Sequence, residues 1–339
     1  MVAPPWYEVP PDRYGGIEWV CSWLTDGLID RGHEVFLIGA GRDLTKAKFF
    51  STYDVPPTHL LGNVLPEAIH SARAYRHLGD LDVDIVHDHS FLGAMTAGGR
   101  SVPTILTVHT PAEGDLAEYY GSFGSSFRLV AISERQRRLS PELPWFATVR
   151  NGIPVADYPF IEKKEDFVLF VGRMSPDKAP HLAIQAAREA GLPLIIAAKC
   201  TEVHEFEYLE AFVKPLLGPD VNYIGEADTI TKKDLLGRAR ALVCPMQWEE
   251  PFGIVMVEAL SCGTPVVAFP RGAVPEIVEH GVSGIICLDA TELPAAIHAT
   301  ANLNPHDCRK RAETLFDTAP MIAGYESVYQ RALLEEGLI

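Results

Sequence analysis

The segment W-E-E-P-F-G-I-V-M-V-E-A-L-S-C-G-T-P-V-V, residues 248–267, places two carboxylates, Glu250 and Glu258, on either side of a predicted helix start. The P-F-G between them breaks the preceding chain, residues 254–261 are compatible with a helix, and the following G-T-P would end it. Unpaired amides and the positive end of a helix dipole favour a phosphate at such a start. At about 1.5 Å per residue the two acids lie at most ~12 Å apart along the axis. This span suits a diphosphate flanked by a sugar and a ribose.

The same segment resembles the E-x7-E signature of retaining glycosyltransferases with two Rossmann domains, the GT-B type, and in particular the family 4-like group that uses nucleotide-sugar donors. The resemblance implies that the first Glu and the amides after it hold the donor sugar, while the second Glu holds the ribose hydroxyls. In this sequence these positions are Glu250, Pro251, Phe252, Gly253, Ile254 and Glu258. A helix with one surface Glu and one buried Glu is the alternative, and the flanking P-F-G and A-L-S-C-G-T-P-V-V favour the ligand site.

Length and charge narrow the class of protein. A chain of 339 residues is long for one hydrophobic core, so two domains are expected. The formal net charge of −16 argues against a nucleic-acid partner. No apolar run reaches the ~18 residues of a membrane span, and prolines interrupt the N-terminal region where a signal peptide would be apolar. We therefore expect a cytoplasmic protein.

A basic run at Arg135, Arg137 and Arg138 stands out against this acidic background. Enzymes of the resembled family that act on lipid acceptors touch the bilayer through a basic amphipathic element. A solvated helix face is the simpler reading of three arginines in this spacing, and we prefer it. Membrane contact is therefore expected to be peripheral at most.

Apolar strand-like runs alternate with helix-length segments along the chain, a pattern typical of parallel α/β sheets. The strands are predicted at residues 34–39, 85–87, 104–108, 129–132, 147–149, 167–171, 193–197, 221–224, 241–244, 265–268 and 284–287. The fold class predicted is α/β, with two Rossmann-like, doubly wound parallel-sheet domains and an interdomain cleft. Asn151-Gly152 and two prolines mark a linker near residues 150–166. We predict an acceptor-binding domain at 1–155, joined by a C-terminal helix at 321–339, and a donor-binding domain at 156–320.

Two segments of the predicted first domain leave its structure open. Members of the resembled family begin with an apolar strand, whereas only three residues precede Pro4 here. Either the first strand is very short, or the chain as given starts a few residues late. The segment 110–127 is rich in Gly, Tyr and Ser, and we predict a flexible lid there.

Tyr14, Gly15 and Gly16 precede a predicted helix whose apolar face begins at Ile17. Glycines at a helix start let the backbone approach an anion closely. By resemblance, Gly15 and Gly16 form the glycine loop that faces the donor phosphates and the acceptor, and Tyr14 lies in the acceptor cleft.

Gly172 and Arg173 end a predicted strand, and Lys178 follows in the same loop. Ligands of doubly wound folds bind at this carboxyl edge of the sheet. The residues match the family motif G-R-x4-K, which implies that Arg173 and Lys178 neutralise the departing diphosphate. The family places Gly after the Lys, whereas this chain has Ala179. The backbone beyond Lys178 is therefore an open point.

His109 closes the strand I-L-T-V-H, and by resemblance it contacts the donor sugar, with its carbonyl beside the reacting carbon. His87 and His89 end the neighbouring strand and are assigned to the acceptor cleft, because the family carries H-x-H here without a metal. The base is expected to be read mainly by backbone near residues 223–226, with Glu226 on the donor. No metal and no permanently bound cofactor are expected.

Two other patterns imitate known motifs. Asp80, Asp82 and Asp84 form overlapping D-x-D motifs but precede a predicted strand, which places them at the wrong edge for a donor metal. Gly39 and Gly41 follow a strand as in a dinucleotide site, yet Leu44 occupies the third glycine position and argues against a dehydrogenase.

The function predicted is a retaining hexosyltransferase that uses a nucleoside-diphosphate sugar, with UDP or GDP expected as the nucleotide, and a carbohydrate or small-molecule acceptor. A metal-independent front-face mechanism is what the resemblance implies, with His109, Arg173, Lys178 and Glu250 at the reaction centre. The alternatives are a nucleotide-sugar epimerase or hydrolase of the same fold, and a non-catalytic nucleotide-binding subunit of a partner transferase.

Overall fold

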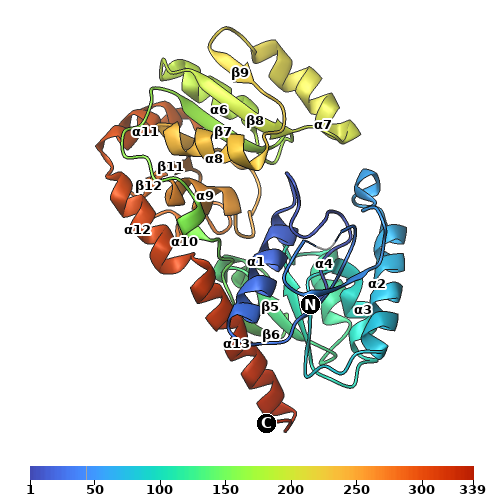
Figure 1. Ribbon diagram of the computed structural model, residues 1–339. Helices are drawn as coiled ribbons and strands as arrows, with labels where there is room; N and C mark the ends of the chain where they lie inside the picture. The colour runs from blue at the N-terminus through green and yellow to red at the C-terminus, as the bar shows by residue number, and fades with distance from the viewer. Residues whose placement is uncertain (43) are drawn as a thin grey trace. The chain divides into compact units, whose positions relative to one another are not determined.

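The computed structural model describes residues 1–42 and 44–339, and the chain divides into two compact units. Unit 1 comprises Met1–Gly152 and Thr318–Ile339, and unit 2 comprises Ile153–Asp317. Figure 1 shows the elements of both units, each built on a parallel sheet with helices around it. The predicted α/β class with parallel sheets is confirmed for both.

Unit 1 contains six strands, all paired in parallel, in its described part. They are β1 (Phe36–Gly39), β2 (Lys48–Ser51), β3 (Val86–Asp88), β4 (Thr104–Val108), β5 (Arg128–Ala131) and β6 (Trp145–Thr148). The helices are α1 (Gly16–Asp30), α2 (Val64–Gly79), α3 (Ala94–Ala97), α4 (Asp115–Gly121), α5 (Glu134–Leu139) and α13 (Thr318–Glu335). The order β3-β4-β5-β6 makes β6 an edge strand, and β1 pairs with β2.

Val2 lies between β1 and β3 in unit 1. This residue forms parallel bridges to both Ile38 and Asp88, and so joins β1 to β3. Its N–H donates to His87 O at 2.8 Å, and its carbonyl accepts from His89 N at 2.9 Å. Val2 is fully buried between these two strands.

The C-terminal helix α13, the long red helix of Figure 1, belongs to unit 1 and packs against α1. Contact is close, because a Cβ added at Gly27 would lie 2.2 Å from Ile322 Cδ1. At the surface, Arg31 pairs with Glu326 at 2.6 Å. The buried Tyr325 of α13 reaches Thr107 of β4 with a hydroxyl contact of 3.1 Å. The chain end thus supplies part of the core of unit 1.

Unit 2 contains one six-stranded parallel sheet of order β12-β11-β10-β7-β8-β9. The strands are β7 (Val168–Arg173), β8 (Leu194–Lys199), β9 (Val221–Tyr223), β10 (Ala241–Cys244), β11 (Val266–Ala268) and β12 (Gly284–Ile286). The helices are α6 (Pro180–Glu189), α7 (Val203–Tyr208), α8 (Thr229–Arg238), α9 (Ile254–Ser261), α10 (Val274–Ile277), α11 (Leu293–Ala299) and α12 (Pro305–Leu315). Fully buried strand residues such as Leu169, Ile196 and Val243 make the core of this unit.

Three expectations need correction. Strand β2 is not predicted by the sequence, because K-F-F-S is short and only half-buried. Strand β6 begins at Trp145, two residues earlier than predicted, because its pairing with β5 shifts register there. The segment 110–127, predicted as a lid, contains helix α4. Tyr120 of this helix packs into the hydrophobic core of unit 1. None of the helices in the described ranges is long and apolar enough to cross a membrane.

Candidate functional site

In unit 2 the carboxylate of Glu250 sits at the centre of a small polar group. Its Oε2 accepts a hydrogen bond from Lys178 Nζ and another from Trp248 Nε1 at 3.0 Å. The ammonium of Lys178 also lies 4.8 Å from the centre of the Trp248 ring, a cation–π arrangement. Two residues that the sequence predicts as ligands, 72 positions apart, are therefore in direct contact.

The backbone of Glu250 is held by the loop after β11. Ala273 N donates to Glu250 O at 2.8 Å, and Gly272 N donates to Glu249 Oε2 at 2.8 Å. Gly272 adopts φ +57°, and a Cβ there would lie 2.1 Å from Glu250 O. Only glycine fits at this close approach, so the position of Glu250 depends on the glycine of the loop.

Gly253 is the residue that turns the chain from this loop into α9. Its φ of +88° lies in the left-handed region, and a Cβ would lie 2.4 Å from Met256 Cε. Helix α9 begins at Ile254, as predicted, and ends at Ser261. The first amides of a helix have no partner within the helix, so the turn at Gly253 presents N–H donors and a positive dipole end beside Glu250.

Arg173 ends β7 and donates to Asp177 at 3.0 Å, while Lys178 lies one residue beyond that acid. The strand register pairs Arg173 with Lys199, so Arg173 and Lys199 lie at the carboxyl edge of the sheet. Ala179, which replaces the glycine of the family motif, has φ +53° and ψ +51°. The loop thus keeps the left-handed conformation that glycine would adopt, at the cost of strain.

Glu258 lies one helical turn into α9 and is buried, with a relative exposure of 4 %. Its Oε1 accepts from Tyr158 OH at 2.8 Å and from Lys232 Nζ at 2.6 Å. Burial, and then the neighbouring Glu258 carboxylate, raise the pKa of Tyr158 above its ordinary value. Tyr158 is therefore a neutral donor that fixes the orientation of Glu258.

Glu226 follows β9 in a loop whose backbone is tied to β8. Ala198 N donates to Gly225 O at 2.9 Å, and Ile224 N donates to Ile196 O at 3.0 Å. Glu226 is half-buried and lies at the same carboxyl edge as Arg173. Unit 2 therefore collects its predicted donor residues at this edge and at the start of α9.

In unit 1 the three predicted histidines form one contact series. His89 Nδ1 lies 2.9 Å from His109 Nε2, and the ring centres of His87 and His89 are 4.0 Å apart. Burial lowers the pKa of His109 to about 3 and lowers the pKa of His87 and of His89 well below the ordinary value. The three imidazoles are therefore neutral at pH 7. As a result, His109 can donate or accept a hydrogen bond but carries no charge.

His87, which the resemblance assigns to the acceptor cleft, is buried inside unit 1. This residue is 3 % exposed, and its two ring nitrogens contact Tyr329 OH at 2.7 Å and Thr107 Oγ1 at 2.8 Å. Both nitrogens are thus used inside unit 1, which makes His87 a structural residue that ties β3 to β4 and α13. His89 is also buried, whereas His109 is partly exposed.

The glycine loop before α1 contains a backbone conformation that favours glycine. Gly15 adopts φ +140° and precedes α1, which begins at Gly16, and a Cβ at Gly15 would lie 2.8 Å from Pro11 Cγ. Tyr14 is 38 % exposed, and its ring centre lies 5.9 Å from that of Tyr7. The loop therefore presents an accessible aromatic ring next to the start of a helix.

Sequence reasoning did not identify two buried acids near this loop, Glu18 and Glu67. Burial, with a smaller contribution from the charge of Glu67, raises the pKa of Glu18 to about 8, and burial raises that of Glu67 to about 7. Glu67 Oε1 accepts from Phe91 N at 2.9 Å. Trp248, Tyr158 and Lys232 were also missed. For Trp248, its place two residues before Glu250 was the available signal.

Comparison with known families matches both halves of the chain to glycosyltransferases. The family model described as glycosyl transferases group 1 matches residues 157–312, and the model of glycosyltransferase family 4 matches residues 14–153. An uncharacterised glycosyltransferase of Methanocaldococcus jannaschii is 26 % identical over 325 residues, covering 82 % of this chain and 83 % of that protein.

Two solved structures show the same architecture over nearly the whole chain. AviGT4, a glycosyltransferase involved in avilamycin A biosynthesis, is 26 % identical with a TM-score of 0.73, and covers 98 % of this chain and 97 % of its own. HepE of Anabaena in complex with UDP-glucose has a TM-score of 0.72 at 19 % identity, with 94 % and 97 % covered. The second likeness bears on the fold alone.

Proposed function

Because the chain belongs to the GT-B glycosyltransferases of the family 4-like group, and is a transferase of EC class 2.4, we propose that it moves a hexosyl group from a nucleoside-diphosphate sugar to an acceptor hydroxyl with retention. The observation that carries the proposal is the contact of Lys178 with Glu250 beside the helix start at Gly253. This group offers a cation and amides for a diphosphate, and a carboxylate for sugar hydroxyls, within one loop.

In the proposed donor site of unit 2, the leaving diphosphate is held by Arg173, Lys178 and the amides of Gly253 and Ile254. Pro251 and Phe252 shape the loop, and the carboxylate of Glu250 accepts from the sugar hydroxyls. These donors act where negative charge grows as the sugar departs, which is where binding energy lowers a barrier.

The nucleoside end of the donor is assigned to Glu258 and to the loop around Glu226. Tyr158 and Lys232 both bond Glu258 Oε1, so the ribose hydroxyls would bond Oε2. The complex of HepE with UDP-glucose makes UDP the first nucleotide to test, and GDP the second.

Unit 1 is proposed to bind the acceptor and to supply His109. Its neutral ring suits a hydrogen bond to a donor-sugar hydroxyl, and its carbonyl is assigned to the side of the reacting carbon. Gly15 and Gly16 are assigned to contacts with the donor phosphates, and Tyr14 and His89 to the acceptor side.

The proposed chemistry is a front-face exchange that needs no metal. The bond between the anomeric carbon and the phosphate oxygen breaks, and the acceptor oxygen bonds the same face of that carbon. The acceptor proton passes to the departing phosphate. Glu250 and Glu258 act through hydrogen bonds to hydroxyls and form no covalent intermediate.

A ligand panel on the full chain tests the donor assignment. UDP, GDP, ADP and TDP, and their glucose, mannose and N-acetylglucosamine conjugates, are compared by thermal shift with and without EDTA, on wild type and on Glu258→Gln. We expect stabilisation by one nucleotide, insensitive to EDTA and reduced in the variant, whereas Glu279→Gln at an exposed position on the same unit leaves it unchanged. Equal shifts in Glu258→Gln and wild type would overturn the ribose assignment.

Product analysis tests the reaction itself. With the stabilising donor and a panel of acceptors, we expect a new glycosidic bond whose anomeric configuration, read by NMR, equals that of the donor. Release of free sugar alone, or of an epimerised nucleotide sugar, would identify a hydrolase or an epimerase instead. An inverted product would contradict retention.

A further inference from the structure

Trp248 belongs to the loop between β10 and α9, which is tied to the loop that follows β7. Gln247 N donates to Asp177 O at 2.7 Å, so the two loops are joined backbone to backbone. This bond involves the residue next to Trp248 and no side-chain atom of Lys178 or Glu250. The place of Trp248 therefore does not depend on the ion pair between those two side chains.

The indole of Trp248 contacts both members of that ion pair. Its Nε1 donates to Glu250 Oε2 at 3.0 Å, and the same oxygen accepts from Lys178 Nζ. The ammonium of Lys178 lies 4.8 Å from the centre of the Trp248 ring. One side chain thus holds the carboxylate through its N–H and attracts the cation through its ring.

The two carboxylate oxygens of Glu250 are used unequally. Oε2 accepts from two donors, whereas none of the residues that the structure describes bonds Oε1. In the proposed reaction a sugar hydroxyl takes Oε1, and Lys178 leaves Oε2 for the diphosphate. Of the two donors on Oε2, the indole N–H of Trp248 is the one that stays.

We propose that Trp248 is a positioning residue, which keeps Glu250 directed at the donor sugar while Lys178 binds the diphosphate. The inference rests on the proposed function of unit 2. A carboxylate on a flexible side chain turns freely once it has lost its bonds, and ordering it again when the ligand binds costs affinity. An indole N–H is a donor without charge, so it fixes the carboxylate and leaves its negative charge for the sugar hydroxyls.

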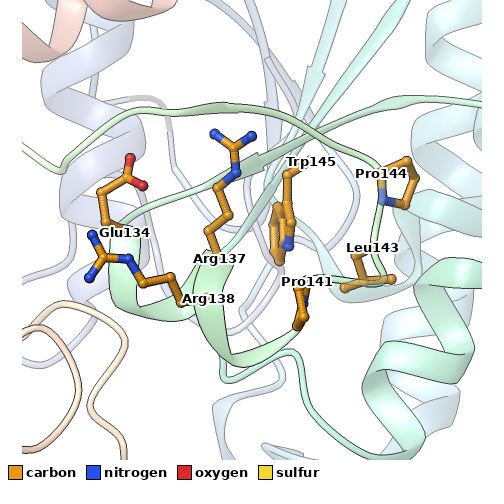
Figure 2. Close-up of a pocket in the computed structure, with 7 residues that line it drawn as sticks. All are labelled: Glu134, Arg137, Arg138, Pro141, Leu143, Pro144 and Trp145. Carbon is orange, nitrogen blue, oxygen red and sulfur yellow. The ribbon is translucent and has the colours of Figure 1, made fainter.

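Trp145 carries the same donor group in a structural role. It lines the pocket drawn in Figure 2, and its Nε1 donates to Ser140 O at 2.8 Å. It is 9 % exposed and belongs to the hydrophobic core of unit 1. Loss of its hydrogen bond therefore bears on the stability of unit 1. This makes Trp145→Phe the matched control for Trp248→Phe, because both changes remove one indole hydrogen bond.

Calorimetric titration of the full chain separates the sugar from the nucleotide. The probes are UDP, GDP, ADP and TDP and their glucose and mannose conjugates. For the nucleotide that binds wild type, Trp248→Phe should weaken the sugar conjugate about tenfold, the scale of one hydrogen bond to a charged group. The affinity for the free diphosphate should stay nearly unchanged, because the diphosphate is not bound through Glu250. Trp145→Phe should leave both affinities as in wild type.

The movement of Lys178 is measured separately, by ¹⁹F NMR of the full chain labelled with 5-fluorotryptophan. Among the five tryptophans, Trp248 is the one that lies in the sequence of unit 2, and Trp248→Phe identifies its resonance. The free diphosphate should shift this resonance, because the ammonium leaves the ring. In Lys178→Met the shift should be smaller, since there is no ammonium to leave.

The possible failures are distinguishable. Equal weakening of the free diphosphate and its sugar conjugate in Trp248→Phe would reveal a merely structural role, and would overturn the inference while the donor site stands. Unchanged affinity for the sugar conjugate would have the same meaning. A Trp248 resonance that the bound diphosphate leaves in place would refute the movement of Lys178. If wild type binds none of the probes, the proposed function itself is refuted, and the inference with it.

Discussion

Replacing Lys178 by Met separates the two tasks that this residue has in the proposed site. In the structure its ammonium pairs with Glu250 and lies over the Trp248 ring, with Met246 Sδ 3.9 Å away. In the proposed reaction the same ammonium holds the departing diphosphate. Met keeps most of the length and the apolar contacts of the side chain, and removes only the charge and its hydrogen bonds.

The expected effects on stability and on turnover differ in size. Glu250 is 8 % exposed, so loss of its cationic partner leaves a poorly solvated carboxylate at a cost of about 1–3 kcal/mol in unfolding free energy. Water still reaches part of the pair and screens it, which favours the lower end of that range. Removing one donor to a developing oxyanion costs about 100-fold or more in kcat, close to 2.7 kcal/mol. We expect the same order of loss here.

The assay combines steady-state kinetics with urea unfolding for Lys178→Met, Glu250→Gln and the double variant. In unfolding, the double variant should lose less than the sum of the single variants, because the amide that replaces the Glu250 carboxylate has no charge to compensate. Lys214→Met, which breaks the exposed pair with Glu210 in the same unit, should change neither quantity measurably. A folded Lys178→Met enzyme with wild-type kcat would refute the assignment of this lysine to the leaving group.

Three further predictions follow from particular contacts. Tyr158→Phe removes the hydroxyl that orients Glu258, so we expect the KM of the donor to rise about three- to tenfold with kcat nearly unchanged, measured by initial rates. An equal fall in kcat would contradict a role in positioning. Ala179→Gly relieves the left-handed strain at φ +53° and should raise unfolding free energy by up to about 1 kcal/mol, whereas a decrease would show that no strain is stored there. Burial raises the pKa of Glu67 from 4.5 to about 7, so its ionisation costs stability as pH rises through that interval. Glu67→Gln, which keeps an acceptor for Phe91 N, should therefore stabilise the protein at pH 8 by on the order of 3 kcal/mol and much less at pH 5. The same gain at both pH values in urea unfolding would refute this.

The strands and helices that the sequence predicts best are those whose pattern is local. Residues 241–244 are a continuous apolar run, residues 104–108 consist of apolar and β-branched residues, and both segments form strands with the predicted bounds. Helix α9 has a breaking P-F-G before it and a glycine after it, so both of its ends are predictable. Strand β2 has neither signal, and only its pairing with β1 makes it a strand. Tertiary contacts, not propensity, decide such segments.

The candidate site likewise has residues that local sequence patterns predict and contacts that they do not. Motif spacing identifies Glu250, Glu258 and Lys178, because each lies in a short segment with its own pattern. Motif spacing does not predict contacts between segments that lie far apart in the sequence. Tyr158 and Glu258, which bond each other, lie 100 residues apart. The conformation of Ala179 was likewise out of reach, since alanine rarely adopts positive φ and only the surrounding loop imposes it.

The charges of unit 2 explain how an acidic chain could accept a diphosphate. Three carboxylates at the carboxyl edge or in α9 pair with a cation: Asp177 with Arg173, Glu250 with Lys178, and Glu258 with Lys232. The net charge of −16 would otherwise repel the ligand. In the proposed complex Lys178 turns to the phosphates while sugar hydroxyls take its place on Glu250. The exchange leaves neither charge without a partner, which matters because an unpaired buried charge is far more costly than a shared one. The pair of Lys178 with Glu250 thus brings together the two side chains that would contact the donor.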